Sequence, residues 1–352
     1  MIKIKLFGLG FFLLALTSCV SKSDSEKLEN EKVEIKKPTI EPLEKPIQIQ
    51  KATFPKVKNV ADLKKTDFIP TLESSFKTGN NIIYGATMPF AWNEIKNFIG
   101  TPLNNFTSEE LKKLNETKSF LNVLKENEYK TAVKFDGIEI TAEAYLKNSL
   151  PFEMALTKFN KTLKFDKSEV ESFGFWTSSS YARINYFKNE DNFSISLFPE
   201  NKEHEIILIM NQKVKNASAD FTQYLKILNQ EKNQNIHFNM GDKVEIPIIE
   251  FNLEKKFSKL VGSKFFSETT MFKIKKAYQQ NAFILNENGA EIYSEVQLAA
   301  EASAEVGFEK PKPKPKPKMM IFNKPFVVFL KRKDANNPYF GVYIANDELL
   351  KK

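Results

Sequence analysis

Apolar and polar residues alternate along much of the second half of the chain, and this repeat of two predicts β-strands. Short charged stretches between them predict turns. The strands that we expect lie at residues 182–187, 193–198, 205–210, 243–251, 273–285, 324–330 and 339–344, and a short apolar strand precedes them at 81–87.

Helical spacing of apolar residues occurs mainly in the first half of the chain. Gly100 and Gly262 each follow such a stretch, as expected at the end of a helix. The helices that we expect lie at 62–76, 88–99, 107–124, 221–228 and 252–261. Long runs of strands, with helices grouped mainly in the N-terminal half, predict the α+β fold class.

The first 18 residues have the pattern of an export signal. Lys3 and Lys5 precede an uncharged apolar run at 6–17, which is shorter than the roughly 20 residues that span a bilayer. The sequence Leu-Thr-Ser-Cys at 16–19 resembles the bacterial lipobox. We therefore expect cleavage before Cys19 and lipid on that cysteine. A plain signal peptide and an uncleaved membrane helix are the alternatives.

Lipid on Cys19 implies a membrane-anchored bacterial lipoprotein. Val20, and not aspartate, follows the cysteine, which favours the outer membrane or the cell surface and leaves the periplasmic or extracellular face open. Residues 19–60 are rich in Lys, Glu, Ser and Pro and predict a flexible tether. We expect the folded domain to occupy residues 61–352. Cys19 is the only cysteine, so no intrachain disulfide forms.

Composition supports a folded core but adds little about chemistry. The chain has 352 residues, of which 41% are hydrophobic and 12% aromatic, and its net charge is +8. Lys and Pro alternate at 310–318, which predicts an exposed polyproline II arm. This arm has two interpretations, a solvated spacer or a positive segment that attracts anionic lipid, polysaccharide or nucleic acid.

Motifs for catalysis and cofactor binding are missing from the sequence. There is no glycine-rich nucleotide loop and no Gly-x-Ser-x-Gly elbow. The two histidines, His204 and His237, have no metal-ligand spacing, and we interpret the serines at 178–180 as a turn. We expect no enzyme activity, no catalytic residue, no metal and no cofactor. We also expect a monomer that binds no nucleic acid.

Four blocks near the C-terminus resemble the serpin family and occur in the serpin order. They lie at 243–262, 283–291, 322–330 and 337–342, and looser matches at 81–84, 144–152 and 192–199 extend the resemblance from about residue 67 to the end. The residues that carry the family signature are Phe322, Asn323, Pro325, Phe326, Phe340 and Gly341.

The resemblance implies a large, mainly antiparallel sheet, several smaller sheets and an exposed reactive-type loop at about 289–321. In serpins a protease cuts this loop, which then enters the large sheet as a new strand. The matching hinge residues are Glu287, Gly289, Ala290, Ile292 and Ser294. The scissile region that we expect contains Ala302, Ser303 and Ala304.

Two functions follow from the resemblance. The first is inhibition of a serine or cysteine protease in the periplasm or outside the cell. The second is a non-inhibitory lipoprotein that binds a protein or carbohydrate partner. Tyr293 and Glu295 stand where inhibitory members keep small residues, and we expect them to hinder insertion of the loop.

Overall fold

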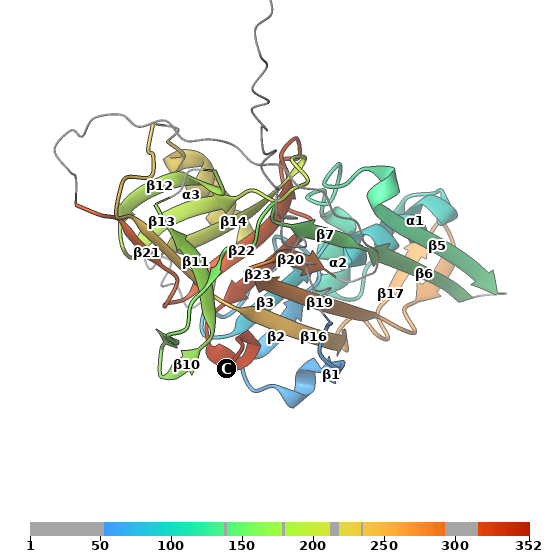
Figure 1. Ribbon diagram of the computed structural model, residues 1–352. Helices are drawn as coiled ribbons and strands as arrows, with labels where there is room; N and C mark the ends of the chain where they lie inside the picture. Colours follow the sequence, from blue (N-terminus) through green and yellow to red (C-terminus); the bar gives the residue numbers. More distant parts are fainter. Residues whose placement is uncertain (1–52, 137–138, 178–179, 212–217, 234, 293–315) are drawn as a thin grey trace, which may run out of the picture. The chain divides into compact units, whose positions relative to one another are not determined.

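The computed structural model describes residues 53–136, 139–177, 180–211, 218–233, 235–292 and 316–352 (Figure 1). The chain divides into two units, Met1–Ile47 and Gln48–Lys352, and every described residue belongs to the second. Strands far outnumber helices in the described part, and the fold class is α+β as predicted. Among these residues, no helix is long and apolar enough to cross a bilayer.

A seven-stranded sheet contains the C-terminal strands of the chain. Its neighbours are antiparallel except for the first two strands in sequence, which run parallel. In spatial order the strands are β12 (Ala182–Asn189), β13 (Asn192–Leu197), β14 (His204–Asn211), β22 (Phe326–Arg332), β23 (Phe340–Ile344), β3 (Asn81–Gly85) and β2 (Thr66–Ile69). All eight residues of β14 are buried, so this central strand is covered on both faces.

Helix α3 (Phe221–Glu231) covers one face of the seven-stranded sheet. It begins at Asp220, whose carboxylate accepts a hydrogen bond from the Gln223 N–H at 3.1 Å. The Phe221 ring lies 5.4 Å from the ring of Phe329 on β22. Gly341 lies beneath the same two rings, and a Cβ there would come within 3.0 Å of Phe329.

A five-stranded sheet packs on the opposite face (Figure 1). Its order is β1 (Lys58–Asn59), β16 (Ile249–Lys256), β19 (Tyr278–Asn286), β20 (Gly289–Ile292) and β7 (Asn148–Pro151), and only β1 and β16 run parallel. Phe283 on β19 joins the two sheets, because its ring lies 4.9 Å from Phe340 on β23 and 5.9 Å from Phe251 on β16. These aromatic contacts form the centre of the core.

A four-stranded sheet lies beside the end of the seven-stranded one. Its order is β21 (Met319–Ile321), β15 (Lys243–Pro247), β11 (Ser172–Trp176) and β8 (Thr157–Lys158). Phe322 follows β21 and is fully buried between Phe193, at 4.9 Å, and Phe326, at 5.2 Å. Strands β20 and β21, which are consecutive among the described strands, therefore belong to different sheets.

Helix α1 (Thr87–Ile99) packs on the hairpin of β5 (Tyr129–Asp136) and β6 (Glu139–Leu146). Phe90 on α1 stacks on Tyr129 with ring centroids 4.2 Å apart. The remaining elements are α2 (Glu109–Glu116), the hairpin β9 (Leu163–Phe165) and β10 (Ser168–Val170), the three-stranded sheet β18 (Thr270–Lys273), β17 (Lys264–Ser267) and β4 (Leu103–Asn104), and the 3-10 turns η1 (Val60–Asp62), η2 (Glu126–Glu128) and η3 (Asp347–Leu349).

Several predicted elements need correction. The helix predicted at 252–261 is wrong, because β16 continues to Lys256. The helix predicted at 62–76 is also wrong, since that region contains η1 and the strand β2. The strand predicted at 243–251 is two strands that belong to different sheets, and the one predicted at 273–285 begins at Tyr278.

The two ends of the loop expected at 289–321 are strands, β20 and β21, and residues 293–315 between them lie outside the described part of the chain. At the N-terminal side of the domain, β1 pairs with β16, and the Asn252 side chain donates to the carbonyl oxygen of Pro55 at 2.9 Å. The predicted boundary at residue 61 stays a prediction.

Candidate functional site

The hairpin between β19 and β20 is the point at which the loop begins. The Asn288 N–H donates to the side-chain oxygen of Asn286 at 2.9 Å, which closes the turn. Gly289 has φ +132, and a Cβ at this position would lie 2.4 Å from the carbonyl oxygen of Leu150. Only glycine fits here, because the backbone of β7 passes directly against it.

Strand β20 lies between β19 and β7 and pairs with both (Figure 1). Ala290 is opposite Leu285 and Leu150, while Ile292 is opposite Phe283 and Asn148. Ala290 is 1% exposed and Ile292 is 3% exposed, so the inward face of β20 is already part of the core. The first four residues of the expected loop are thus a central strand of the five-stranded sheet.

The neighbours of β20 continue beyond its end, and in the described part of the chain their edges there are free. Residues 278–282 of β19 pair with β16 on one side and, among described residues, with nothing on the other. Strand β6 continues the line of β7, and within the same described ranges it pairs with β5 alone. Figure 1 shows β5 and β20 on opposite sides of the line formed by β6 and β7. The free edges of β19 and β6 therefore lie on the side where β20 would be extended.

Two buried amides lie on β19 where its edge is free. Gln279 is 5% exposed and Asn281 is 7% exposed. The Gln279 amide nitrogen donates to the Gly85 carbonyl oxygen at 3.1 Å and to the Thr87 hydroxyl at 2.8 Å. Its Oε1, and the Nδ2 of Asn281, have no hydrogen-bond partner among the described residues. Such unpaired buried groups cost about 1–3 kcal/mol each, so both would gain from a further partner.

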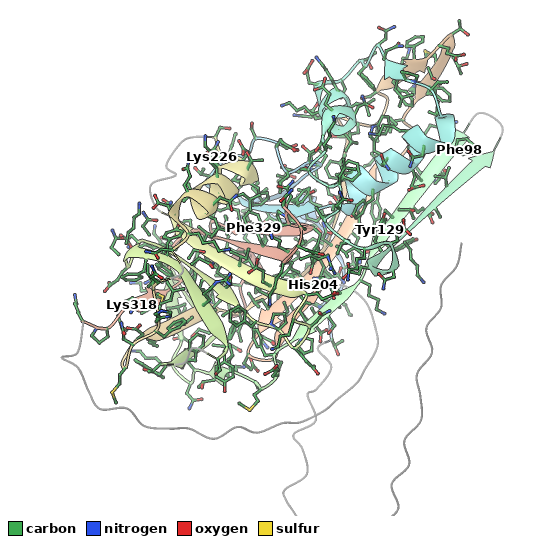
Figure 2. All side chains as sticks on the ribbon, turned by 90° about the horizontal axis from the view of Figure 1, so that it is seen from above. Phe98, Tyr129, His204, Lys226, Lys318 and Phe329 are labelled. Carbon is green, nitrogen blue, oxygen red and sulfur yellow. The ribbon has the colours of Figure 1, made fainter. Side chains whose placement is uncertain are left out.

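A polar cluster surrounds His204 (Figure 2) and includes Asn148 of β7, the neighbour of β20 on the side away from β19. His204, at the start of β14, has no exposed surface. Its Nε2 lies 2.8 Å from the Glu128 carboxylate and its Nδ1 lies 3.2 Å from the Tyr339 hydroxyl. Nδ1 also lies 3.3 Å from the amide nitrogen of Asn148, the residue that pairs with Ile292. The cluster thus connects the end of β20 to the seven-stranded sheet.

Arg332 supplies the positive charge of this cluster. Its guanidinium contacts Glu128 at 2.9 Å, Glu203 at 3.2 Å and Asp334 at 3.0 Å. These carboxylates raise the pKa of Arg332 further, and the ion pair lowers the pKa of Asp334. Burial lowers the pKa of His204, while the Glu128 carboxylate opposes this shift. Since Arg332 already neutralises Glu128, the contacts fit a neutral His204 that donates from Nε2 and accepts at Nδ1.

The structure brings four of the five predicted hinge residues together. Gly289, Ala290 and Ile292 form β20, and Glu287 lies in the preceding turn, where its Oε2 is buried without a partner among the described residues. Ser294 lies outside the described residues, as do Cys19 and the scissile candidates Ala302, Ser303 and Ala304.

The signature residues have structural positions. Phe326, Phe340 and Gly341 belong to β22 and β23, and Phe322 fills the junction of two sheets. Asn323 and Pro325 form the short connection from β21 to β22. These residues therefore position the site and do not form it.

The sequence did not reveal the polar members of the site. Asn148 and His204 are 56 residues apart and meet only through the packing of two sheets. One signal was available for the amides. Gln279 and Asn281 interrupt a strand whose next four residues, at 282–285, are all apolar and buried. No group of acidic, histidine or cysteine side chains in the described part of the chain has metal-binding geometry.

Comparison with known proteins gives little beyond these observations. No family model matches the sequence, and no curated protein matches it. Among solved structures, Manduca sexta serine protease inhibitor (serpin)-12 is 11% identical with a TM-score of 0.37 and covers 58% of this chain. Thyroxine-binding globulin in complex with thyroxine is 8% identical with a TM-score of 0.39 and covers 74% of this chain.

The chain spans 55% of the serpin-12 chain and 65% of the thyroxine-binding globulin chain, less than two thirds of each. Because both TM-scores are below 0.5, these likenesses carry no argument about family or function. The site must be interpreted from its own geometry.

Proposed function

We propose that this chain is a serpin-like protease inhibitor in which a protease cuts the segment between β20 and β21. After the cut, the residues that follow Ile292 extend β20 along the free edges of β19 and β6. The observation that carries this proposal is the position of β20. A strand of four residues already lies between β7 and β19, and both neighbours continue past its end.

The register of β20 favours its own extension. Continued pairing would place residue 293 opposite Ala282, residue 294 opposite Asn281 and residue 296 opposite Gln279, because Ile292 is opposite Phe283. Side chains alternate between the two faces of a strand. Ser294 and Val296 would therefore point inward, on the same face as Ala290 and Ile292.

This alternation weakens the objection raised by Tyr293 and Glu295. Both would point to the outward face, as Glu291 does. Glu295 would lie opposite the exposed Gln280, so its charge would stay outside the core, whereas Tyr293 would lie opposite the buried Ala282. Only the bulk of Tyr293 therefore remains to be accommodated.

Extension of β20 has an identifiable energetic gain. A buried Val296 would contribute about 1.5–3 kcal/mol. A Ser294 hydroxyl next to Asn281 would offer a partner to the unpaired Nδ2. New backbone hydrogen bonds along two free edges add to this, as in other cases of strand addition. Before cleavage the segment is joined to β20 at one end and to β21 at the other. The stabilisation from a longer β20 therefore becomes available only after the segment is cut.

The test is a comparison of melting curves before and after a single cut within residues 299–308. We expect the cut protein to melt about 5 °C or more above the intact one, since 1 kcal/mol moves the melting temperature by about 2 °C in a large domain. Ser294→Arg should abolish this rise, because its charge would have to be buried unpaired. Glu295→Arg is the matched control and should keep the rise, because residue 295 would lie opposite the exposed Gln280.

Two outcomes would contradict the extension of β20. The first is an unchanged melting temperature in the cut wild-type protein. The second is an equal rise in both arginine variants. Either variant should leave the intact protein unaffected, because both positions follow the last residue of β20.

An inhibitor and a non-inhibitory binding protein differ in one further measurement. Incubation with the protease should give an inhibitor complex that survives SDS, because strand extension would stop water from hydrolysing the acyl bond between the protease nucleophile and the new C-terminus of the cut segment. A protein that is cut and stabilised, but forms no such complex with any serine or cysteine protease, would fit the non-inhibitory alternative.

We also propose that the protein acts from a membrane, through lipid on Cys19. The support is the sequence at 16–19 and the apolar run before it. The residues between Cys19 and the folded domain would then act as a tether at the outer membrane or cell surface. At that location the loop would meet proteases of the periplasm or the exterior.

A further inference from the structure

The C-terminal end of the loop is held by a buried ion pair. Asp242 has no exposed surface. One of its carboxylate oxygens accepts a hydrogen bond from the Lys318 backbone N–H at 2.6 Å, and the other lies 2.7 Å from Lys318 Nζ. The second oxygen also accepts from the Asn239 N–H at 2.8 Å. Backbone and side chain of Lys318 are thus bound by one carboxylate.

The peptide bond after Lys318 is also held in regular structure. The Lys318 carbonyl oxygen accepts from the Lys243 N–H at 3.0 Å, and Met319 begins β21, which pairs in parallel with β15. The Lys318 side chain is 12% exposed, and Met320 is fully buried. Figure 2 shows Lys318 at the margin of the folded unit, at the opposite end from Phe98. A protease would have to pull this end of the loop out of the sheet to reach the bond.

Lys318 matters because the sequence leaves no other basic residue open to cleavage in the loop. Residues 289–309 contain neither Lys nor Arg. Proline follows each of the other four lysines, at 310, 312, 314 and 316. Proline restricts the backbone before it and replaces the N–H of the scissile bond with a ring, which makes these bonds poor substrates.

We infer that the Asp242–Lys318 pair and the Lys-Pro repeat together close the loop to trypsin-like proteases. A trypsin-like protease binds the ammonium group of lysine through an aspartate in its primary specificity pocket. The ammonium group of Lys318 already forms an ion pair with Asp242 and is not available to that aspartate. An elastase-like pocket takes small residues, which the loop offers at Ala302, Ser303 and Ala304.

This inference rests on the proposed function, because it says which class of protease the loop excludes. The two remain separable. Pro317→Ala is the matched control, since it creates a bond between Lys316 and residue 317 that trypsin can cut, immediately outside the ion pair. Asp242→Asn is the variant that removes the charge from the pair.

The experiment is brief digestion with trypsin, or with elastase, followed by identification of new N-termini by mass spectrometry. Trypsin should produce a new N-terminus at position 317 in Pro317→Ala and at Met319 in Asp242→Asn. Two rates of trypsin cleavage are compared, that after Lys318 in the wild type and that after Lys316 in Pro317→Ala. The first should be at least about tenfold lower than the second. Elastase should cut the wild type within residues 299–304.

The outcomes separate the two claims. Wild-type cleavage after Lys318 as fast as cleavage of the control overturns the inference, even if Asp242→Asn fails to fold. The inference also fails if folded Asp242→Asn resists trypsin. If neither trypsin cuts the control nor elastase cuts the wild type, the loop is not accessible, and the proposed function fails as well.

Discussion

His204 shows how one residue can couple the site to pH. It is fully buried, and its two ring nitrogens contact Glu128 on one side and Tyr339 and Asn148 on the other. Glu203 and Arg332 complete the charges that surround it. Protonation would place a positive charge beside Arg332 on a side chain that has no exposed surface. Burial therefore keeps His204 neutral and holds its pKa below the usual value.

A pH dependence of stability follows from this shift. The unfolded chain binds a proton at His204 near pH 6.5, whereas the folded protein binds it only at lower pH. The unfolded state therefore holds more protons in this range, and the free energy of unfolding should fall as the pH is lowered from about 7 to 5. Stability from this residue is complete above pH 6.5 and is lost as the pH approaches the folded-state pKa.

Denaturant titrations at several pH values measure this effect. We expect His204→Gln to have a flatter profile between pH 7 and 5 than the wild type. His237→Gln is the control, because His237 is exposed, and it should keep the wild-type slope. Parallel profiles for wild type and His204→Gln would show that the histidine does not report on this cluster.

At the scale of elements, alternation in the sequence was sufficient where strands lie between well-defined turns. Strands β12, β13 and β14 were predicted at 182–187, 193–198 and 205–210, close to the observed ranges. The helix predicted at 252–261 failed because Leu253, Phe257 and Leu260 have helical spacing and are all buried. Pairing of β16 with β19 over eight residues overrides that local preference.

The residues predicted as a hinge lie in regular structure, which the sequence did not indicate. Gly289 and Ala290 were predicted at the start of a loop, and the structure places them in a strand with neighbours on both sides. That arrangement depends on β7, which is more than 130 residues away in the chain and has no local signal that points to β20. Asn148 and His204 were not predicted as site residues for a similar reason, since they are 56 residues apart and have no local signal that pairs them.

At the scale of the whole molecule, the loop connects two different sheets. Its first residues lie in the five-stranded sheet and its last in the four-stranded one. A cut between them would free the N-terminal part to extend β20, while Asp242 continues to hold the C-terminal part. The proposed lipid anchor would keep both parts at the membrane after cleavage.

The anchor gives a prediction of its own. Cys19→Ala should remove the lipid, stop processing before residue 19 and leave the protein outside the membrane fraction, because the acyl chains supply the binding energy. Val20→Ala is the control and should be processed and retained normally. Fractionation with antibody detection measures both. A Cys19→Ala protein of mature size in the membrane fraction would contradict the lipoprotein assignment.

Hydrogen exchange on the cut protein tests the central claim most directly. If β20 lengthens after cleavage, amides of β19 at 278–282 and of β6 at 140–146 gain partners on their free edges. Their exchange should slow by at least about tenfold relative to the intact protein, while β14, which is buried in both forms, stays unchanged. Unchanged exchange at β19 and β6 after a complete cut would contradict strand extension and the function proposed from it.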